Sequence, residues 1–376
     1  MIISNGVVFG DDGVFSKQEI EVQNGKITAI GDSLPRNGRD TIDARECYVV
    51  PGLVDIHTHG AMGADFSDGT PEAIEIIARY LLGCGVTAFL GTTMSLPEAR
   101  LMDICKTAAS FVDAIEPDQA VLHGIHLEGP FFSQEKRGAQ NGKYIVDPDH
   151  QMFTRLFEAS RKTVRLIATA PELKGGLEFI KSVTPLCNVS LAHSSSDYET
   201  AARAFSLGAN HVTHLFNGMN VYNHREPGIV GAAYDCGAYV ELISDGVHIH
   251  PSIVRAVFKL FGDDRVCLIS DSMRACGLAD GKYDLGGQSI TVVGKSAKTD
   301  NNSLAGSVTS LADCMRKSVE FGVPVTSAIK AATINPAKSV GLDKEIGSIT
   351  VGKRADILVL DQELFLRQII FGGVKI

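Results

Sequence analysis

The sequence predicts an α/β protein in which an eight-stranded barrel is joined to a small β-sandwich domain. Three observations predict this fold. Apolar runs of strand length alternate with helical segments through the middle of the chain, which is typical of a parallel sheet built from βα units. Strand-like segments without helices between them occupy both ends of the chain. Ionisable residues recur where the central strands end, and parallel barrels carry their functional groups at that end.

Residues 1–50 form the first part of the predicted sandwich. Asn24-Gly25 is a strong hairpin signal between two of its strands. The expected strands are Val7–Phe9, Glu19–Val22, Lys26–Ile30, Thr41–Asp43 and Tyr48–Val50. A module this short buries too little apolar surface to fold alone. Residues 345–376 are again strand-like, at Gly347–Ile349, Gly352–Leu360 and Phe371–Val374. We therefore expect the two termini to build one domain together.

In residues 51–344, the alternation of eight apolar runs with helical segments predicts a closed (β/α)8 barrel of the TIM type. Its eight expected strands are Leu53–Ile56, Val86–Leu90, Val121–Leu127, Val164–Ala168, Val189–Ala192, His211–Leu215, Tyr239–Ile243 and Val266–Ile269. The expected helices are Pro71–Leu82, Leu96–Phe111, Pro148–Ser160, Tyr198–Leu207, Pro251–Phe261, Ser307–Phe321 and Val325–Ala337. Between the last strand and these last helices, Lys282–Ser303 predicts a β-hairpin insertion at the mouth of the active site.

Composition and charge exclude several classes of function. The 376 residues are 44% hydrophobic and 21% charged, as in an ordinary globular protein. The net charge of −9 argues against a nucleic-acid binder or a protein that binds anionic membranes. No segment has transmembrane length, the N-terminus does not resemble a signal peptide, and the eight cysteines form no C-x-x-C pair. We expect a cytoplasmic protein.

The first barrel strand ends in His57-Thr58-His59. Residues i and i+2 of an extended chain point to the same side, so both imidazoles can face one metal ion. Further candidates follow later strands, at Glu128, His193, His214, Asp245, His248 and Asp271. Any one of them could be a capping residue or a core histidine. Their recurrence at successive strand ends predicts a catalytic metal site, with an uncoordinated aspartate as proton acceptor.

Several longer motifs resemble the amidohydrolase superfamily, and within it the deacetylases of amino-sugar phosphates. The motifs span nearly the whole chain: Pro51–Gly60, His126–Phe131, Lys136–Gln140, His214–Met219, His224–Gly228, Ser244–His248, Asp271–Ala275, Leu304–Ser307, Asn335–Ala337 and Gly352–Asp356. The runs His126-Leu127-Glu128-Gly129-Pro130 and His224-Arg225-Glu226-Pro227-Gly228 are the more specific ones.

The resemblance implies a role for each candidate residue. Glu128, His193 and His214 match the principal metal ligands, and His57 with His59 would add a second metal site bridged by Glu128. Asp271 matches the catalytic base and acid, and His248 matches a histidine that contacts the substrate at the catalytic centre. The implied substrate-binding residues are Gln140, Asn217, Gly218, His224, Arg225 and His248. Arg225 matches a phosphate-binding arginine supplied by the neighbouring subunit, which implies a homodimer.

The implied reaction is metal-dependent hydrolysis of the acetamide of N-acetylglucosamine 6-phosphate to glucosamine 6-phosphate and acetate, in amino-sugar catabolism. One or two divalent ions are expected; zinc is the first choice, and iron, cobalt and manganese suit the same ligands. Two alternatives stay open: the same reaction on N-acetylgalactosamine 6-phosphate, and a metal-free barrel that serves as a binding or assembly protein. The motif Asn223-His224-Arg225, which suits a phosphate, argues against a third, an amidohydrolase acting on cyclic ureides.

Overall fold

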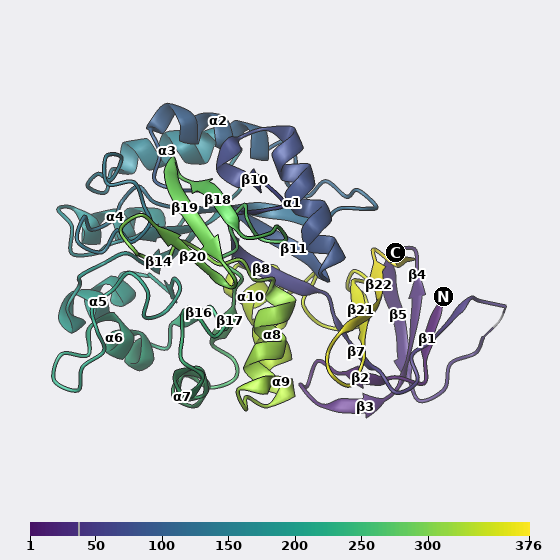
Figure 1. Ribbon diagram of the computed structural model, residues 1–376. Coiled ribbons are helices and arrows are strands. Elements are labelled where there is room, and N and C mark those ends of the chain that lie inside the picture. Colours follow the sequence, from purple (N-terminus) through teal and green to yellow (C-terminus); the bar gives the residue numbers. More distant parts are fainter. Residues whose placement is uncertain (37) are drawn as a thin grey trace.

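The computed structural model describes residues 1–36 and 38–376, and it contains the expected barrel (Figure 1). Eight parallel strands form one sheet in the order β17-β16-β15-β14-β13-β12-β11-β8. They are β8 (Leu53–Thr58), β11 (Val86–Thr92), β12 (Val121–Glu128), β13 (Val164–Thr169), β14 (Asn188–Leu191), β15 (His211–Val212), β16 (Tyr239–Leu242) and β17 (Val266–Leu268). The chain beyond β17 meets β8, where the Asp271 amide donates to the His57 carbonyl at 3.0 Å. All eight expected strands are confirmed.

Helices surround the barrel, and five of the described α-helices begin at a residue whose side chain caps the helix. In α1, Thr70 Oγ1 accepts the amide of Ala73 and Pro71 occupies the first turn. The helices are α1 (Pro71–Gly83), α2 (Glu98–Ala108), α3 (His150–Ala159), α4 (Gly176–Val183), α5 (Tyr198–Ser206), α6 (Gly228–Cys236), α7 (Pro251–Phe261), α8 (Leu311–Glu320), α9 (Val325–Ala332) and α10 (Ile334–Ser339). A short 3-10 helix, η1 (Phe66–Asp68), precedes α1.

The helices differ from the sequence prediction in three places. The expected single helix Val325–Ala337 is divided into α9 and α10 at Thr333, whose φ of −133° is not helical. The division follows from Pro336, which has no N–H to continue the helical ladder. Helices α4 and α6 were not expected, because each begins with a turn signal: Gly175-Gly176 for α4 and Pro227-Gly228 for α6.

Both termini contribute to the sandwich, which lies to one side of the barrel (Figure 1). One sheet has the order β5-β4-β1-β6 and the other β23-β22-β21-β7-β2-β3. Their strands are β1 (Ile2–Ser4), β2 (Val7–Phe9), β3 (Phe15–Lys17), β4 (Glu19–Gln23), β5 (Lys26–Gly31), β6 (Thr41–Asp43), β7 (Tyr48–Pro51), β21 (Ile357–Leu360), β22 (Leu366–Phe371) and β23 (Val374–Lys375). Antiparallel pairing of β7 with β21 joins the two ends of the chain. Gly347–Ile349 is not a strand, contrary to expectation.

The insertion after the last barrel strand has three strands rather than the expected two. They are β18 (Gly281–Leu285), β19 (Gln288–Val293) and β20 (Ser296–Thr299), paired antiparallel in that order. Buried Leu285 and Ile290 pack against Met94 and Met273, so one face of this small sheet rests on the loops of the barrel (Figure 1). Within the described part of the chain, no helix combines the length and apolarity that crossing a membrane requires.

Candidate active site

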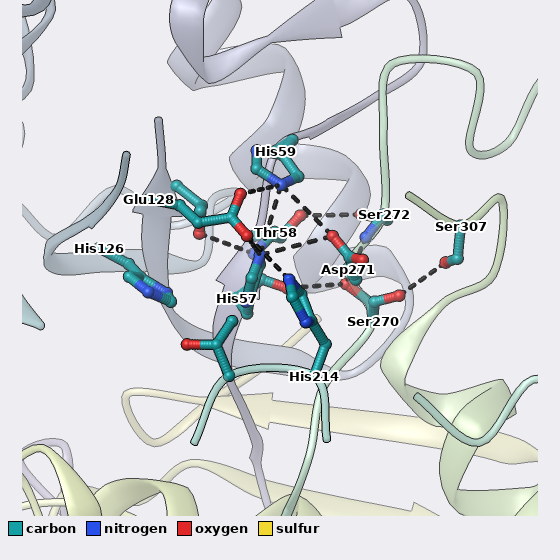
Figure 2. Close-up of polar contacts among 12 residues, drawn as sticks. His57, Thr58, His59, His126, Glu128, His214, Ser270, Asp271, Ser272 and Ser307 are labelled. Carbon is teal, nitrogen blue, oxygen red and sulfur yellow. Dashed lines mark hydrogen bonds and ion pairs between the residues drawn. The ribbon is translucent and has the colours of Figure 1, made fainter. Parts of the chain in front are cut away.

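The histidine pair at the end of β8, with His57 inside the strand and His59 just after it, faces a common point inside the barrel mouth. His57 Nε2 and His59 Nε2 lie 3.3 Å apart, as expected for residues i and i+2 of an extended chain. A short hairpin, β9 (Gly60–Ala61) and β10 (Ala64–Asp65), follows directly. Both imidazoles are almost fully buried, at 0% and 2% exposure. Figure 2 shows the two rings converging on Glu128 and Asp271.

Glu128, the last residue of β12, is the centre of this cluster (Figure 2). Its Oε1 lies 2.9 Å from His214 Nε2 and 3.2 Å from His193 Nε2. Its Oε2 lies 3.3 Å from His59 Nε2. Oε1 therefore faces His193 and His214, and Oε2 faces His59, while His57 Nε2 lies 3.8 Å from Oε1. Two groups of three side chains, His57/His59/Glu128 and Glu128/His193/His214, have ligand atoms within 4.8 Å of one another.

His193 and His214 leave their strands in strained backbone conformations. His193 has φ 44° and His214 has φ 29°, and Asp271, which follows β17, has φ 47°. Positive φ is costly for residues other than glycine and concentrates at functional sites. The His193 Nδ1–H donates to the Lys136 carbonyl at 2.9 Å, and the other ring nitrogen, Nε2, faces Glu128. Anchoring one ring nitrogen in this way is typical of metal-binding histidines.

The charges in this cluster are coupled. Burial raises the pKa of Glu128, but His57 and the hydrogen bonds from His193, His214 and His59 outweigh it and hold the pKa well below its usual value. Burial lowers the pKa of His57, but the carboxylates of Asp271 and Glu128 and the hydrogen bond to Glu241 raise it to about 9. A divalent ion would supply the positive charge that protonated imidazoles supply otherwise, so buried His and Glu donors of this kind fit a metal.

Asp271 and His248 lie at the edge of the same cluster. Asp271 Oδ1 is 3.4 Å from His57 Nε2 and 3.3 Å from His59 Nε2. Burial raises the pKa of Asp271, but His57, His59 and His214 lower it to about 2, so the side chain is a carboxylate at neutral pH. His248 is oriented by Asp245, whose Oδ2 lies 2.8 Å from His248 Nδ1.

A cavity of about 310 Å³ opens above the cluster. It is lined by His59, Glu128, His193, His214, Asp271, His248, Gln140, Asn217, Gly218, Gly138, Ala139, Met94, Phe216, Leu285, Ser303, Leu304 and Gly306. Four of the six expected substrate-binding residues belong to this lining. Leu285 lies at the end of β18, so the insertion helps to wall the cavity as expected. Met94, Phe216 and Leu285 were not anticipated, because apolar lining residues look like core residues in a sequence.

The side chain of Gln140 is fixed by hydrogen bonds within the protein. Its side chain is 3% exposed, its Oε1 accepts the Ser95 amide at 2.7 Å, and its Nε2 donates to Glu128 Oε2 at 2.8 Å. It therefore orients the central carboxylate in addition to facing the cavity.

The remaining two expected substrate-binding residues lie elsewhere. His224 and Arg225 are exposed and do not line this cavity. They follow Val221 and Tyr222, whose exposed fractions are 87% and 48%. In the described part of the chain, the cavity lining contains no lysine or arginine.

Comparison with known proteins gives consistent results. Residues 48–375 match the Amidohydrolase family. The chain is 32% identical to N-acetylglucosamine-6-phosphate deacetylase of Bacillus subtilis (strain 168) over 96% of this chain and 93% of that protein. It is 33% identical to N-acetylgalactosamine-6-phosphate deacetylase of Escherichia coli over 96% of each. The crystal structure of N-acetyl-D-glucosamine-6-phosphate deacetylase from Mycobacterium smegmatis superimposes with a TM-score of 0.93 at 30% identity, covering all of both chains.

Proposed function

The chain belongs to the amidohydrolase family, and we propose that it hydrolyses the acetamide of N-acetylglucosamine 6-phosphate to glucosamine 6-phosphate and acetate. The observation that carries this proposal is the position of Glu128 in the lining of the cavity, with Oε1 beside His193 and His214 and Oε2 beside His59. Buried histidine and glutamate donors beside an open cavity are the arrangement that a catalytic metal site needs.

Glu128, His193 and His214 would hold one divalent ion, and His57 and His59 would add a second site that shares Glu128. Imidazole and carboxylate ligands suit zinc best, and they also accept iron, cobalt or manganese. A bound divalent ion would supply Lewis acidity toward the attacking water and the acetamide carbonyl. The ligand set supports zinc as the first metal to test.

Asp271 is the proposed base and acid. Its carboxylate is ionised at neutral pH and lines the cavity beside the two histidines, so it can accept a proton from the attacking water. The same side chain then returns the proton to the departing amine nitrogen, as breaking the C–N bond requires. His248, fixed by Asp245, points a ring at the cavity and can donate to the substrate.

Asn217 and Gly218 line the cavity and are the proposed contacts to the sugar phosphate from within the chain. Gln140 faces the same cavity while it orients Glu128. Every residue of the lining lies between His59 and Gly306, which supports residues 51–344 as the catalytic domain. Residues 1–50 and 345–376 would then be structural.

The phosphate group is proposed to be bound by a second copy of the chain, with Arg225 reaching across from that copy. A phosphate group is usually met by lysine or arginine, and the described lining of the cavity contains neither. A guanidinium forms paired hydrogen bonds with phosphate oxygens, and His224 lies beside it. Val221, Tyr222 and Ile253 line an apolar hollow that shares Phe216 and His248 with the cavity. A partner seated on this hollow would bury the apolar surface and bring in its own Arg225.

Mixing two inactive variants tests both the function and the dimer. Arg225→Ala and Asp271→Asn should each lose most acetate release from N-acetylglucosamine 6-phosphate. In a mixed dimer, the subunit with intact Asp271 receives an intact arginine from the other subunit. Coexpression in equal amounts should restore about a quarter of the wild-type sites, because half of randomly formed dimers are mixed and each has one complete site. Activity no higher than the sum of the two variants would show that Arg225 does not act across subunits.

The galactosamine epimer is the second candidate substrate. The specific observation in its favour is the 33% identity to an N-acetylgalactosamine-6-phosphate deacetylase, which is as high as the identity to the glucosamine enzymes. Measuring kcat/KM for both sugar phosphates with the same protein decides between them, and we expect the gluco epimer to be preferred.

A further inference from the structure

Glu241 is a fully buried carboxylate directly behind the histidine pair. It lies within β16 and has no exposed surface. Its Oε2 is 2.9 Å from His57 Nδ1, which is the ring nitrogen opposite the one that faces Glu128 and Asp271. The same oxygen accepts the backbone amide of His214 at 3.4 Å. Its Oε1 has no hydrogen-bond partner in the described part of the chain.

A carboxylate at this depth costs free energy unless a donor satisfies it. His126 is nearby, but its Nδ1 lies 3.2 Å from the Ile56 carbonyl and so carries the proton there, which leaves Nε2 without one in the neutral ring. His57 is therefore the side-chain donor that Glu241 has. His59 differs from His57, because its Nδ1 has no partner to fix the ring.

We infer that Glu241 is a positioning residue for a second divalent-ion site formed by His57, His59 and Glu128. By accepting from the Nδ1–H of His57, it fixes the tautomer that leaves the Nε2 lone pair free and aims that lone pair at His59 and Glu128. The first site, at His193 and His214, depends on a different anchor, the Lys136 carbonyl. This inference rests on the proposed metal-dependent function.

Zinc binding to chelator-stripped protein tests this role without an activity assay. Competition against a chromogenic chelator should give two equivalents for the wild type. Glu241→Leu removes the acceptor and should weaken the second equivalent about 10- to 100-fold, the usual cost of losing the partner of a metal-binding histidine, while the first equivalent keeps its affinity. Glu241→Gln keeps a side chain of the same length with an acceptor oxygen, so the affinity for the second equivalent should fall less.

Cys267→Ala is the matched control, because fully buried Cys267 lies directly opposite Glu241 in the neighbouring strand and, among the described residues, is not a hydrogen-bond partner of His57. It should bind both equivalents as the wild type does. A folded Glu241→Leu protein with an unchanged second equivalent would overturn the inference, and so would an equal loss of both equivalents. If Glu241→Leu does not fold, Glu241→Gln is used instead: the second equivalent should bind more weakly than in the wild type while the first keeps its affinity, and an unchanged second equivalent would overturn the inference.

A wild type that takes up a single equivalent would also overturn the role of Glu241. That result would leave the proposed function standing, since acetate release by the protein with one ion is measured separately. If the protein binds two ions but releases no acetate, the proposed substrate is wrong, and the inferred role of Glu241 is unaffected.

Discussion

Replacing Gln140 tests how the central carboxylate is held. Gln140→Leu keeps the size of the side chain but removes its bonds to Glu128 Oε2 and to the Ser95 amide. Losing a hydrogen bond to a charged group costs about 1.5–3 kcal/mol, and a buried amide left unpaired costs about 1–3 kcal/mol more. Burying the leucine side chain returns about 2 kcal/mol. We expect the metal-free protein to lose about 0.5–4 kcal/mol of unfolding free energy, with a middle value of about 2 kcal/mol, measured by urea unfolding.

Gln134→Leu is the control for this experiment. Gln134 belongs to the same loop and also donates from Nε2, to the Gly142 carbonyl at 2.7 Å, but its side chain is exposed. Exposed substitutions of this kind change stability by about 0.5 kcal/mol or less. A Gln140→Leu protein as stable as the Gln134→Leu protein would refute the argument that Gln140 holds Glu128. A change confined to KM would leave Gln140 as a substrate contact alone.

Three other perturbations follow from the same geometry. Asp271→Asn should lower kcat about 10²- to 10⁴-fold with metal content unchanged, and near-normal turnover would exclude it as the proton acceptor. Gly218→Ala would place a Cβ 2.8 Å from His193 Nδ1 at a φ of 62°, so zinc should bind more weakly in a chelator competition; wild-type affinity would mean that His193 is not a ligand. The pKa of His57 is about 9 in the folded, metal-free protein and 6.5 ordinarily, so its contribution to stability is complete below pH 6.5 and disappears as the pH rises to 9. Urea unfolding of stripped protein should therefore show lower stability at pH 9 than at pH 6.5, and equal or higher stability would contradict the raised pKa.

The barrel could be predicted because its strands are continuous apolar runs bounded by turn signals. Its irregular parts could not. The sixth expected strand, His211–Leu215, ends at Val212, since His214 takes a positive φ to turn into the site. The third strand of the insertion, Ser296–Thr299, has a polar sequence that pairing with β19 holds in place. In both cases the extent of the strand depends on contacts with other parts of the fold, which the local sequence pattern does not reveal.

The candidate site could be predicted for those residues that lie at the ends of the barrel strands. His57, His59, Glu128 and His214 were found because histidine or glutamate directly after an apolar run is conspicuous. Glu241 gave no such signal, because a single polar residue inside a strand also fits an outward-facing position. Only its contact with His57 distinguishes it.

Acetate release from N-acetylglucosamine 6-phosphate, measured beside the metal content per subunit before and after chelation, tests the central claim most directly. We predict one or two divalent ions per subunit, loss of acetate release when they are removed, and recovery when zinc is restored. Metal without acetate release on either epimer would contradict the proposed substrate. Protein that carries no metal and takes none up would contradict the enzyme itself and favour a binding or assembly role for the barrel.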